Sequence, residues 1–263
     1  DGSDATTTNT VKVFTGKKYI NGTNTEAAFI LAEGSRKVVL PTDCSSLFAT
    51  SRLLQTVTFD DVDASQVTTM EKMFYHGSKL TTVNLGDMDA SKVTTMANMF
   101  AGSDVLTTVR FGEVNATSLT TTADMFYSCK KLSKVDLSEF STSDALRNIK
   151  EMFTNCNVLK SLNLSGFNTT KVQLATNGNT MFQNCWYLEK LTVGPNFAFK
   201  NGALVAVKME KPSTSYISGV DGNWHSLSTG ATYASGSNFP QKADTYYVYP
   251  VGMLSSSWKS ELI

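Results

Sequence analysis

A dipeptide of methionine followed by phenylalanine recurs at nearly constant spacing through the middle of this 263-residue chain. From one phenylalanine to the next the steps are 26, 26, 26, 27 and 29 residues. A period of this size is typical of a solenoid, in which each repeat forms one coil and buries its apolar side chains only by stacking on its neighbours. The copies, the first of them degenerate, are Leu47-Phe48, Met73-Phe74, Met99-Phe100, Met125-Phe126, Met152-Phe153 and Met181-Phe182.

Each repeat carries the same apolar pattern around this dipeptide. The stretch 82–85 alternates polar and apolar residues, which predicts a strand with Val83 and Leu85 inward. Ahead of the next phenylalanine, Val93, Met96 and Met99 follow one another in steps of three, which favours one face of a short helix. Strand, turn, helix and return therefore make one coil, and successive strands are expected to pair in parallel.

The repeat resembles a known family. The segment "DASKVTTMANMFAGSDVLTTVRF" and its copies closely resemble the BspA-like leucine-rich repeats of bacterial surface proteins, over roughly residues 38–200. Pattern and resemblance together predict an α/β fold: a right-handed leucine-rich repeat solenoid of about six coils of ~26 residues. A parallel β-sheet is expected on one face and short helices on the other, with β-rich N- and C-terminal caps.

Three regions follow from where the period begins and ends. Residues 1–40 are predicted to be an N-terminal cap, 41–200 the solenoid, and 201–263 a β-rich, aromatic C-terminal cap. The aromatic side chains of this last region, Trp224 and Tyr246 among them, fit either a hydrophobic core or a ligand platform. The long last interval predicts a bulge at residues 175–179, where Asn-Gly favours a turn.

Composition limits the partners. The 23 basic and 23 acidic residues balance, so no long-range attraction to nucleic acid or to an anionic membrane is expected. No apolar run approaches the ~18 residues of a membrane span. With few charged residues and many Thr, Ser and Asn, the composition favours an extracellular protein. The family resemblance implies a cell-surface protein that is attached to the cell wall through parts outside this chain. It is expected to act as a monomer.

The outward strand positions are the predicted binding surface, because they are polar and differ from repeat to repeat. They are Thr58, Asn84, Arg110, Asp136, Asn163 and Thr192. Plain solubility explains the same pattern equally well.

Two polar columns mark the turn after each strand. Four successive repeats place a carboxylate at one position, where the side chains are either screened by solvent or bind a cation such as Ca²⁺: Asp61, Asp87, Glu113 and Glu139. Two residues later comes a second column, expected to hydrogen-bond the backbone of its own turn: Asp63, Asp89, Asn115, Ser141 and Asn168.

Catalysis finds little support. Cys129, Cys156 and Cys185 share one column with Gly77 and Ser103, which predicts a tight, buried packing position. The two histidines, in turn, lie in no nucleophile motif. By resemblance, the prediction is a non-enzymatic, cofactor-free cell-surface adhesin that binds a protein or glycan of host or bacterial surfaces. The alternatives are a structural spacer and a glycan-binding module that uses the C-terminal aromatics.

Overall fold

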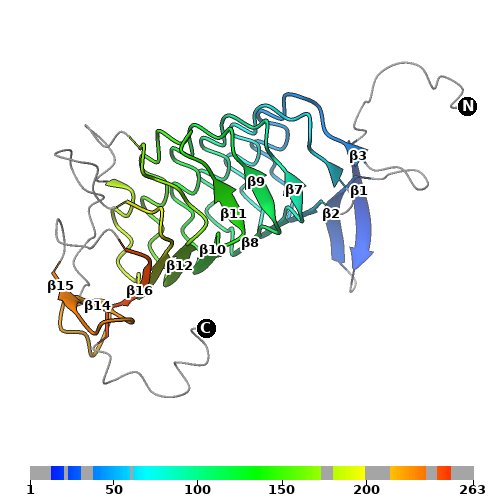
Figure 1. Cartoon of the computed structure of the whole chain (residues 1–263). Helices are drawn as coiled ribbons and strands as arrows, with labels where there is room; N and C mark the ends of the chain where they lie inside the picture. Colours follow the sequence, from blue (N-terminus) through cyan, green and yellow to red (C-terminus); the bar gives the residue numbers. More distant parts are fainter. Residues whose placement is uncertain are drawn as a thin grey trace, which may run out of the picture.

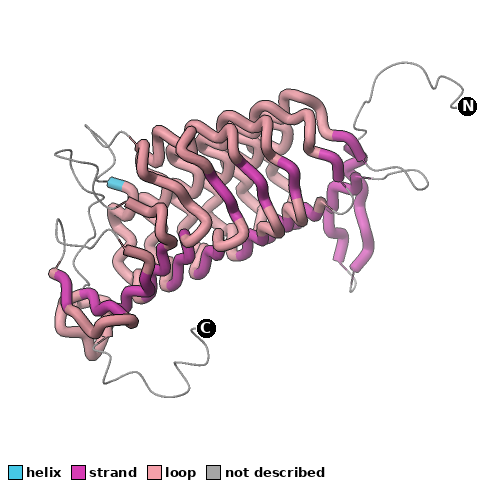
Figure 2. The backbone as a smooth tube through the Cα atoms, in the orientation of Figure 1, coloured by secondary structure: helices cyan, strands magenta, loops and turns pink. Residues whose placement is uncertain are grey.

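The structure is a computed structural model that describes residues 13–20, 23–30, 38–59, 62–172, 180–198, 214–234 and 242–249. Within these residues the chain winds into a β-solenoid of about six coils, stacked side by side into a rod (Figure 1). Short strands alternate with long stretches of turn, as the tube of Figure 2 shows.

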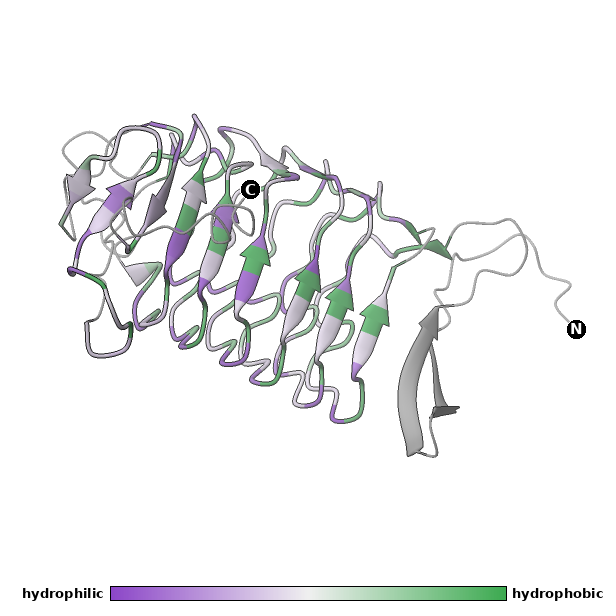
Figure 3. Ribbon diagram, turned by 90° about the horizontal axis from the view of Figure 1, so that it is seen from below, coloured by the Kyte–Doolittle hydropathy of each residue, from purple (hydrophilic) through white to green (hydrophobic). Residues whose placement is uncertain are grey.

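The first sheet runs along one side of the rod, seen from below in Figure 3. Its parallel strands fall into two ladders, β4–β6–β8 and β10–β12–β13, and β8 lies beside β10. The middle residue of each three-residue strand, such as Val83, is buried, and its polar neighbours face outward. The bounds are β4 Thr56–Thr58, β6 Thr82–Asn84, β8 Thr108–Arg110, β10 Lys134–Asp136, β12 Ser161–Leu164 and β13 Lys190–Val193.

A second set of parallel strands forms another side of each coil. One ladder contains β7, β9 and β11, and β3 pairs with β5, which lies beside β7. Their bounds are β3 Val38–Val39, β5 Val62–Asp63, β7 Met88–Asp89, β9 Val114–Ala116 and β11 Phe140–Thr142.

On the third side of each coil, the prediction of short helices is wrong. No α-helix occurs among the residues described, and the segment from Thr69 to Gly77, with its equivalents in the other coils, forms what we call the turn ribbon. Alternate amides of the ribbon donate to the next coil: Met70 N to Thr95 O at 3.0 Å, Phe74 N to Met99 O at 2.8 Å. These amides are therefore not available for helical bonding.

Left-handed backbone explains why the ribbon is not a helix. Two positions in each of the first five coils have positive φ, as at Lys72 (56°) and His76 (53°), and an α-helix of L-residues excludes that conformation. The steps of three come instead from successive tight turns, such as Met73 N to Met70 O. A turn and a helix share this spacing, so the apolar pattern fits both.

The interior is built on a row of stacked phenylalanine rings. Centroids of neighbouring rings from Phe48 to Phe153 are 5.2–5.3 Å apart, and Phe153 to Phe182 measures 6.2 Å. Every ring of the row is at most 7% exposed, so the predicted interior row is confirmed. The wider last step coincides with the longest sequence interval, and the predicted bulge at 175–179 lies outside the described residues.

Both ends carry antiparallel strands. At the N-terminal end, β1 (Val13–Ile20) and β2 (Thr23–Ile30) form a hairpin, and β2 lies near β4. At the C-terminal end, β16 (Asp244–Tyr247) pairs with β13 and so extends the first sheet, followed by β14 (Trp224–Ser226) and β15 (Thr232–Tyr233).

Three of the C-terminal aromatics are core residues, whereas Tyr216 is exposed. Trp224 is 2% exposed, and Tyr246 and Tyr247 are also buried. A platform that stacks a ligand needs an accessible ring face, so these side chains cannot supply the predicted glycan-binding surface.

Candidate binding surfaces

The six predicted binding residues lie on the outer side of the first sheet, which we call the strand face. Strand register aligns Thr58, Asn84 and Arg110 in one row, and Asp136, Asn163 and Thr192 in another. Rows in parallel register repeat at ~4.8 Å. The structure therefore brings together, along one side of the rod, residues that are about 26 positions apart in the sequence.

Three of these six residues also shape the backbone. The Oδ1 atoms of Asn84, Asp136 and Asn163 accept hydrogen bonds from amides two residues later, at 3.2, 3.0 and 3.1 Å. Each closes an Asx turn where the chain leaves its strand. Thr192 is also engaged, because its Oγ1 lies 3.0 Å from Thr245 Oγ1 on β16. From polarity alone, a residue that closes a turn could not be told apart from a residue that binds a partner.

Charge on the strand face is mixed. Lys134 and Lys190 share a row with Ser161 between them, while Arg110 ends one of the two rows described above and Asp136 begins the other. Partial burial lowers the pKa of the Lys190 ammonium, and Lys134 nearby lowers it further, while Asp136 opposes both effects. The face thus presents cationic groups with an interspersed carboxylate.

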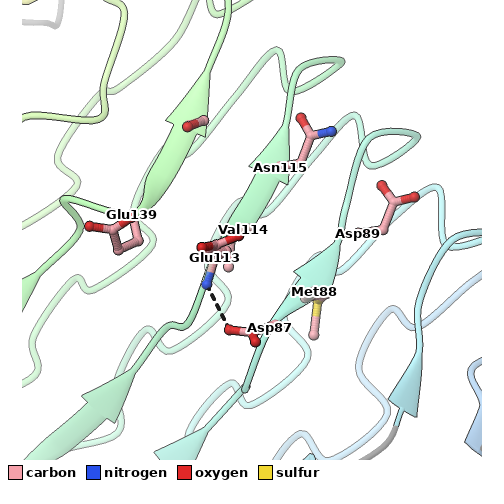
Figure 4. A pocket seen from close by; sticks show the side chains of 8 residues that line it. Asp87, Met88, Asp89, Glu113, Val114, Asn115 and Glu139 are labelled. Atoms are coloured by element: carbon pink, nitrogen blue, oxygen red, sulfur yellow. Dashed lines mark hydrogen bonds between the residues drawn. The ribbon is translucent and has the colours of Figure 1, made fainter.

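An open groove of about 550 Å³ lies over the second set of strands (Figure 4). It contains three members of the predicted carboxylate column, Asp87, Glu113 and Glu139, while Asp61 lies outside the described residues. Asp87 Oδ1 accepts a hydrogen bond from the Glu113 amide at 3.0 Å, which links two coils. In the part of the chain that the structure describes, no group of three or more His, Cys, Asp or Glu side chains is placed to hold a metal ion.

Steric crowding explains why the carboxylate column ends at Gly166. A Cβ there would lie 2.4 Å from the carbonyl oxygen of Phe140 and 2.7 Å from that of Ser138. Both are backbone atoms of the preceding coil, so no larger side chain fits at this position without moving the coil.

The second turn column forms the expected turns at three of its members. Asp63, Asp89 and Asn168 accept hydrogen bonds through Oδ1 from amides two residues later, at 2.9, 3.0 and 3.1 Å. Hydrogen bonds from Ser91 lower the pKa of the Asp89 carboxyl. This column builds turns.

The cysteine column is a buried ladder, as predicted. Cys129, Cys156 and Cys185 donate their thiol protons to carbonyls of Phe100, Phe126 and Phe153, at 3.3, 3.1 and 3.1 Å. Ser103 does the same to Phe74 O at 2.9 Å. Burial raises the pKa of the Cys156 thiol to about 12 and that of Cys129 well above its usual range, so neither thiol is a nucleophile near neutral pH.

An exposed aromatic pair lies beside the last coil, and sequence reasoning missed one of its members, Trp186, while Tyr216 belongs to the predicted aromatic C-terminal region. The rings of Trp186 and Tyr216 stack with centroids 5.3 Å apart and planes 13° from parallel. Trp186 is 42% exposed and Tyr216 48%. A signal was present, because the repeat position of Trp186 is polar in the five preceding coils: Arg52, Ser78, Asp104, Lys130 and Asn157.

Comparison with known proteins gives a family. The family described as "Mycoplasma protein of unknown function, DUF285" matches residues 42–161 and 107–196, which together span more than half of the chain. No curated protein and no solved structure matches. Among the described residues, no helix has the length and apolarity needed to cross a membrane. The chain therefore belongs to the DUF285 family, which is of the BspA-like leucine-rich-repeat type, and its repeats form a β-solenoid.

Proposed function

We propose that this protein is a non-enzymatic binding module that acts outside a bacterial cell. It adheres to a protein or glycan of a host or bacterial surface through the strand face, and it is held at the cell wall through parts outside this chain. The observation that carries the proposal is the row Thr58, Asn84, Arg110, in which side chains of different chemistry stand in register on one regular sheet.

Rigidity suits this role. The strand face rests on a core of phenylalanine rings stacked at 5.2–5.3 Å, and the backbone is bonded from coil to coil. A partner that docks on a preordered surface causes little loss of conformational entropy. Many copies on one cell would add avidity to weak single contacts.

Several features support binding without catalysis. The thiols of the cysteine column are buried, and the pKa values of Cys129 and Cys156 are raised. Formal charge is balanced over the chain, which favours protein or glycan partners over nucleic acid.

A spacer role is the second candidate, and the Asx turns favour it. Asn84, Asp136 and Asn163 each have a structural reason to be polar, so their presence does not require a partner. A spacer would present the same face to solvent with no preferred ligand.

An adhesion assay with a matched variant tests the proposal. The whole chain, coupled to beads, is offered immobilised extracellular-matrix proteins, mucin and bacterial cells. The double variant Arg110→Ser, Lys134→Ser removes two cations from the strand face, and Lys92→Ser, Lys130→Ser removes two exposed cations elsewhere on the coils. We expect only the strand-face variant to lose adhesion. Equal adhesion of both variants would contradict the strand face as the adhesive surface, and no adhesion by the parent chain would support the spacer.

A further inference from the structure

The exposed pair Trp186 and Tyr216 forms a second surface, separate from the strand face. Trp186 lies at the corner between the turn ribbon and the strand face, four residues before β13 begins. The preceding coils stack with Arg, Ser, Asp, Lys or Asn at this position, so packing of the solenoid does not require an aromatic side chain there. We propose that Trp186 and Tyr216 form a platform that stacks a sugar ring of an uncharged glycan.

The geometry of the rings fits stacking. Their planes are nearly parallel, at 13°, and both side chains are about half exposed, whereas Trp224 and Tyr246 are buried. Tyr187, which packs against the core, contacts Tyr216 with 5.5 Å between ring centroids and so helps to hold it in place. Exposed apolar surface that is held rigid and bordered by polar groups marks interaction sites. The C–H face of a pyranose ring is the flat, weakly polar partner that such a pair of rings accepts.

Carboxamides border the platform on the solenoid side. Asn157 occupies the Trp186 position one coil earlier, and its Nδ2 donates to Asn184 O at 3.3 Å. Asn184 Nδ2 in turn donates to Asn155 Oδ1 at 2.7 Å. A carboxamide has both donors and an acceptor, which is what sugar hydroxyls need from a binding site.

Charge selects an uncharged ligand. Along the same column, Lys130 pairs with Asp104, with 3.1 Å between Nζ and Oδ2, so this cation is already neutralised by a neighbour. The whole chain has a formal net charge of zero. Single-stranded nucleic acid also stacks on aromatic rings, but it relies on a positively charged groove along its backbone. The column of Trp186 instead offers the carboxamide of Asn157 and a cation paired with a carboxylate, so a neutral glycan fits best.

Affinity electrophoresis of the full chain tests the proposal. The protein is run in native gels that contain mannan, a β-glucan, a galactan or dextran, with single-stranded oligo-dT as a separate probe. In Trp186→Asn the residue of the preceding coil replaces the tryptophan, so the solenoid should fold normally. Leu227→Ala, which removes an exposed apolar side chain elsewhere in the C-terminal segment, is the matched control.

We expect at least one neutral polysaccharide to retard the parent chain and the Leu227→Ala control equally. Trp186→Asn and Tyr216→Ala should weaken binding roughly tenfold, about 1.4 kcal/mol, and Trp186→Phe should restore part of it. The strand-face variant Arg110→Ser, Lys134→Ser should bind the polysaccharide normally, which separates this site from the adhesive face. The proposal is overturned if no polysaccharide retards the chain, if Trp186→Asn binds as well as the parent, or if oligo-dT binds in preference.

Discussion

The apolar side of one sheet is buried both in the coils from 62 to 172 and in the C-terminal segment from 214 to 249. The contacts that bury it differ between the two regions. In the coils each contact recurs once per repeat: phenylalanine on phenylalanine, amide to the carbonyl of the next coil. In the described residues of the C-terminal segment, 214–234 and 242–249, no contact recurs in this way. Antiparallel strands surround Trp224 and Tyr246, and the carboxylate of Asp244 accepts hydrogen bonds from the hydroxyls of Ser226 and Ser228.

The two regions differ in how many interfaces a single side chain stabilises. A side chain in the middle of a repeat row touches an equivalent neighbour on both sides, so its loss weakens two interfaces at once. A side chain of the C-terminal segment has no equivalent neighbours on either side, so its loss weakens only its own contacts. β16 joins the two regions, because its pairing with β13 places Tyr246 opposite Leu191 in one continuous sheet.

The largest effect is expected for Phe126→Ala, which removes a ring stacked 5.2 Å from Phe100 and 5.3 Å from Phe153. Loss of a fully buried ring with its cavity should lower the free energy of unfolding by about 3–5 kcal/mol, measured by denaturant titration. Thr58→Ala, on the exposed strand face, should cost less than about 0.5 kcal/mol. Similar costs for the two variants would show that the inward and outward sides are assigned wrongly.

A pair of glycine substitutions compares the two regions directly. A Cβ at Gly194, in the last coil, would lie 2.0 Å from the backbone oxygen of Ser165. Gly194→Ala should therefore cost about 2–3 kcal/mol through overpacking. Gly230 in the C-terminal segment has φ of +70° and no atom within 4 Å of an added Cβ, so Gly230→Ala should cost only about 1 kcal/mol of backbone strain. Thermal unfolding of both variants checks the order, and the reverse order would contradict the close stacking of the last two coils.

The C-terminal segment should be the more acid-sensitive region. Burial raises the pKa of the Asp244 carboxyl, but hydrogen bonds from Ser226, Ser228 and Thr245 outweigh burial and lower the pKa below its ordinary 3.8. A lowered pKa in the folded state contributes stability above pH 3.8 that is lost as the pH falls through the folded-state value.

Asp244→Asn tests this dependence. It should cost about 1 kcal/mol at pH 7 and make unfolding less dependent on pH below 4. Unfolding followed by tyrosine and tryptophan fluorescence from pH 7 to 2 measures both quantities. An unchanged acid slope would assign the sensitivity to other carboxylates.

The smallest effect is expected within the thiol ladder. Cys129→Ser places in one coil the residue that the preceding coil already uses, since Ser103 Oγ donates to Phe74 O as Cys129 Sγ does to Phe100 O. The cost should be under about 1 kcal/mol, and Cys129→Val, which lacks the donor, should cost more. If valine is tolerated better than serine, packing rather than hydrogen bonding governs this column.

Much of the solenoid could be predicted from the chain because its signal is repeated. The spacing of Phe74, Phe100 and Phe126 predicts the interior row, and alternation at Thr82–Leu85 predicts the strand and its outward side. Binding residues were harder to identify. Asn84 and Asp136 are polar because they close turns, and Trp186 occurs once, so periodicity neither explains it nor draws attention to it.

By itself the sequence determined the period, the number of coils and the side chains that point inward, because burial of apolar residues every ~26 positions has few other solutions. Only the tertiary structure decided between helix and turn ribbon. Both conformations place Val93, Met96 and Met99 on one side of the chain. The choice between them depends on the backbone amides. These amides donate to carbonyls of the neighbouring coil, because those carbonyls already lie within hydrogen-bonding distance. Non-glycine residues such as Lys72 then adopt positive φ at a local cost of about 1–2 kcal/mol, which stacking on both sides offsets.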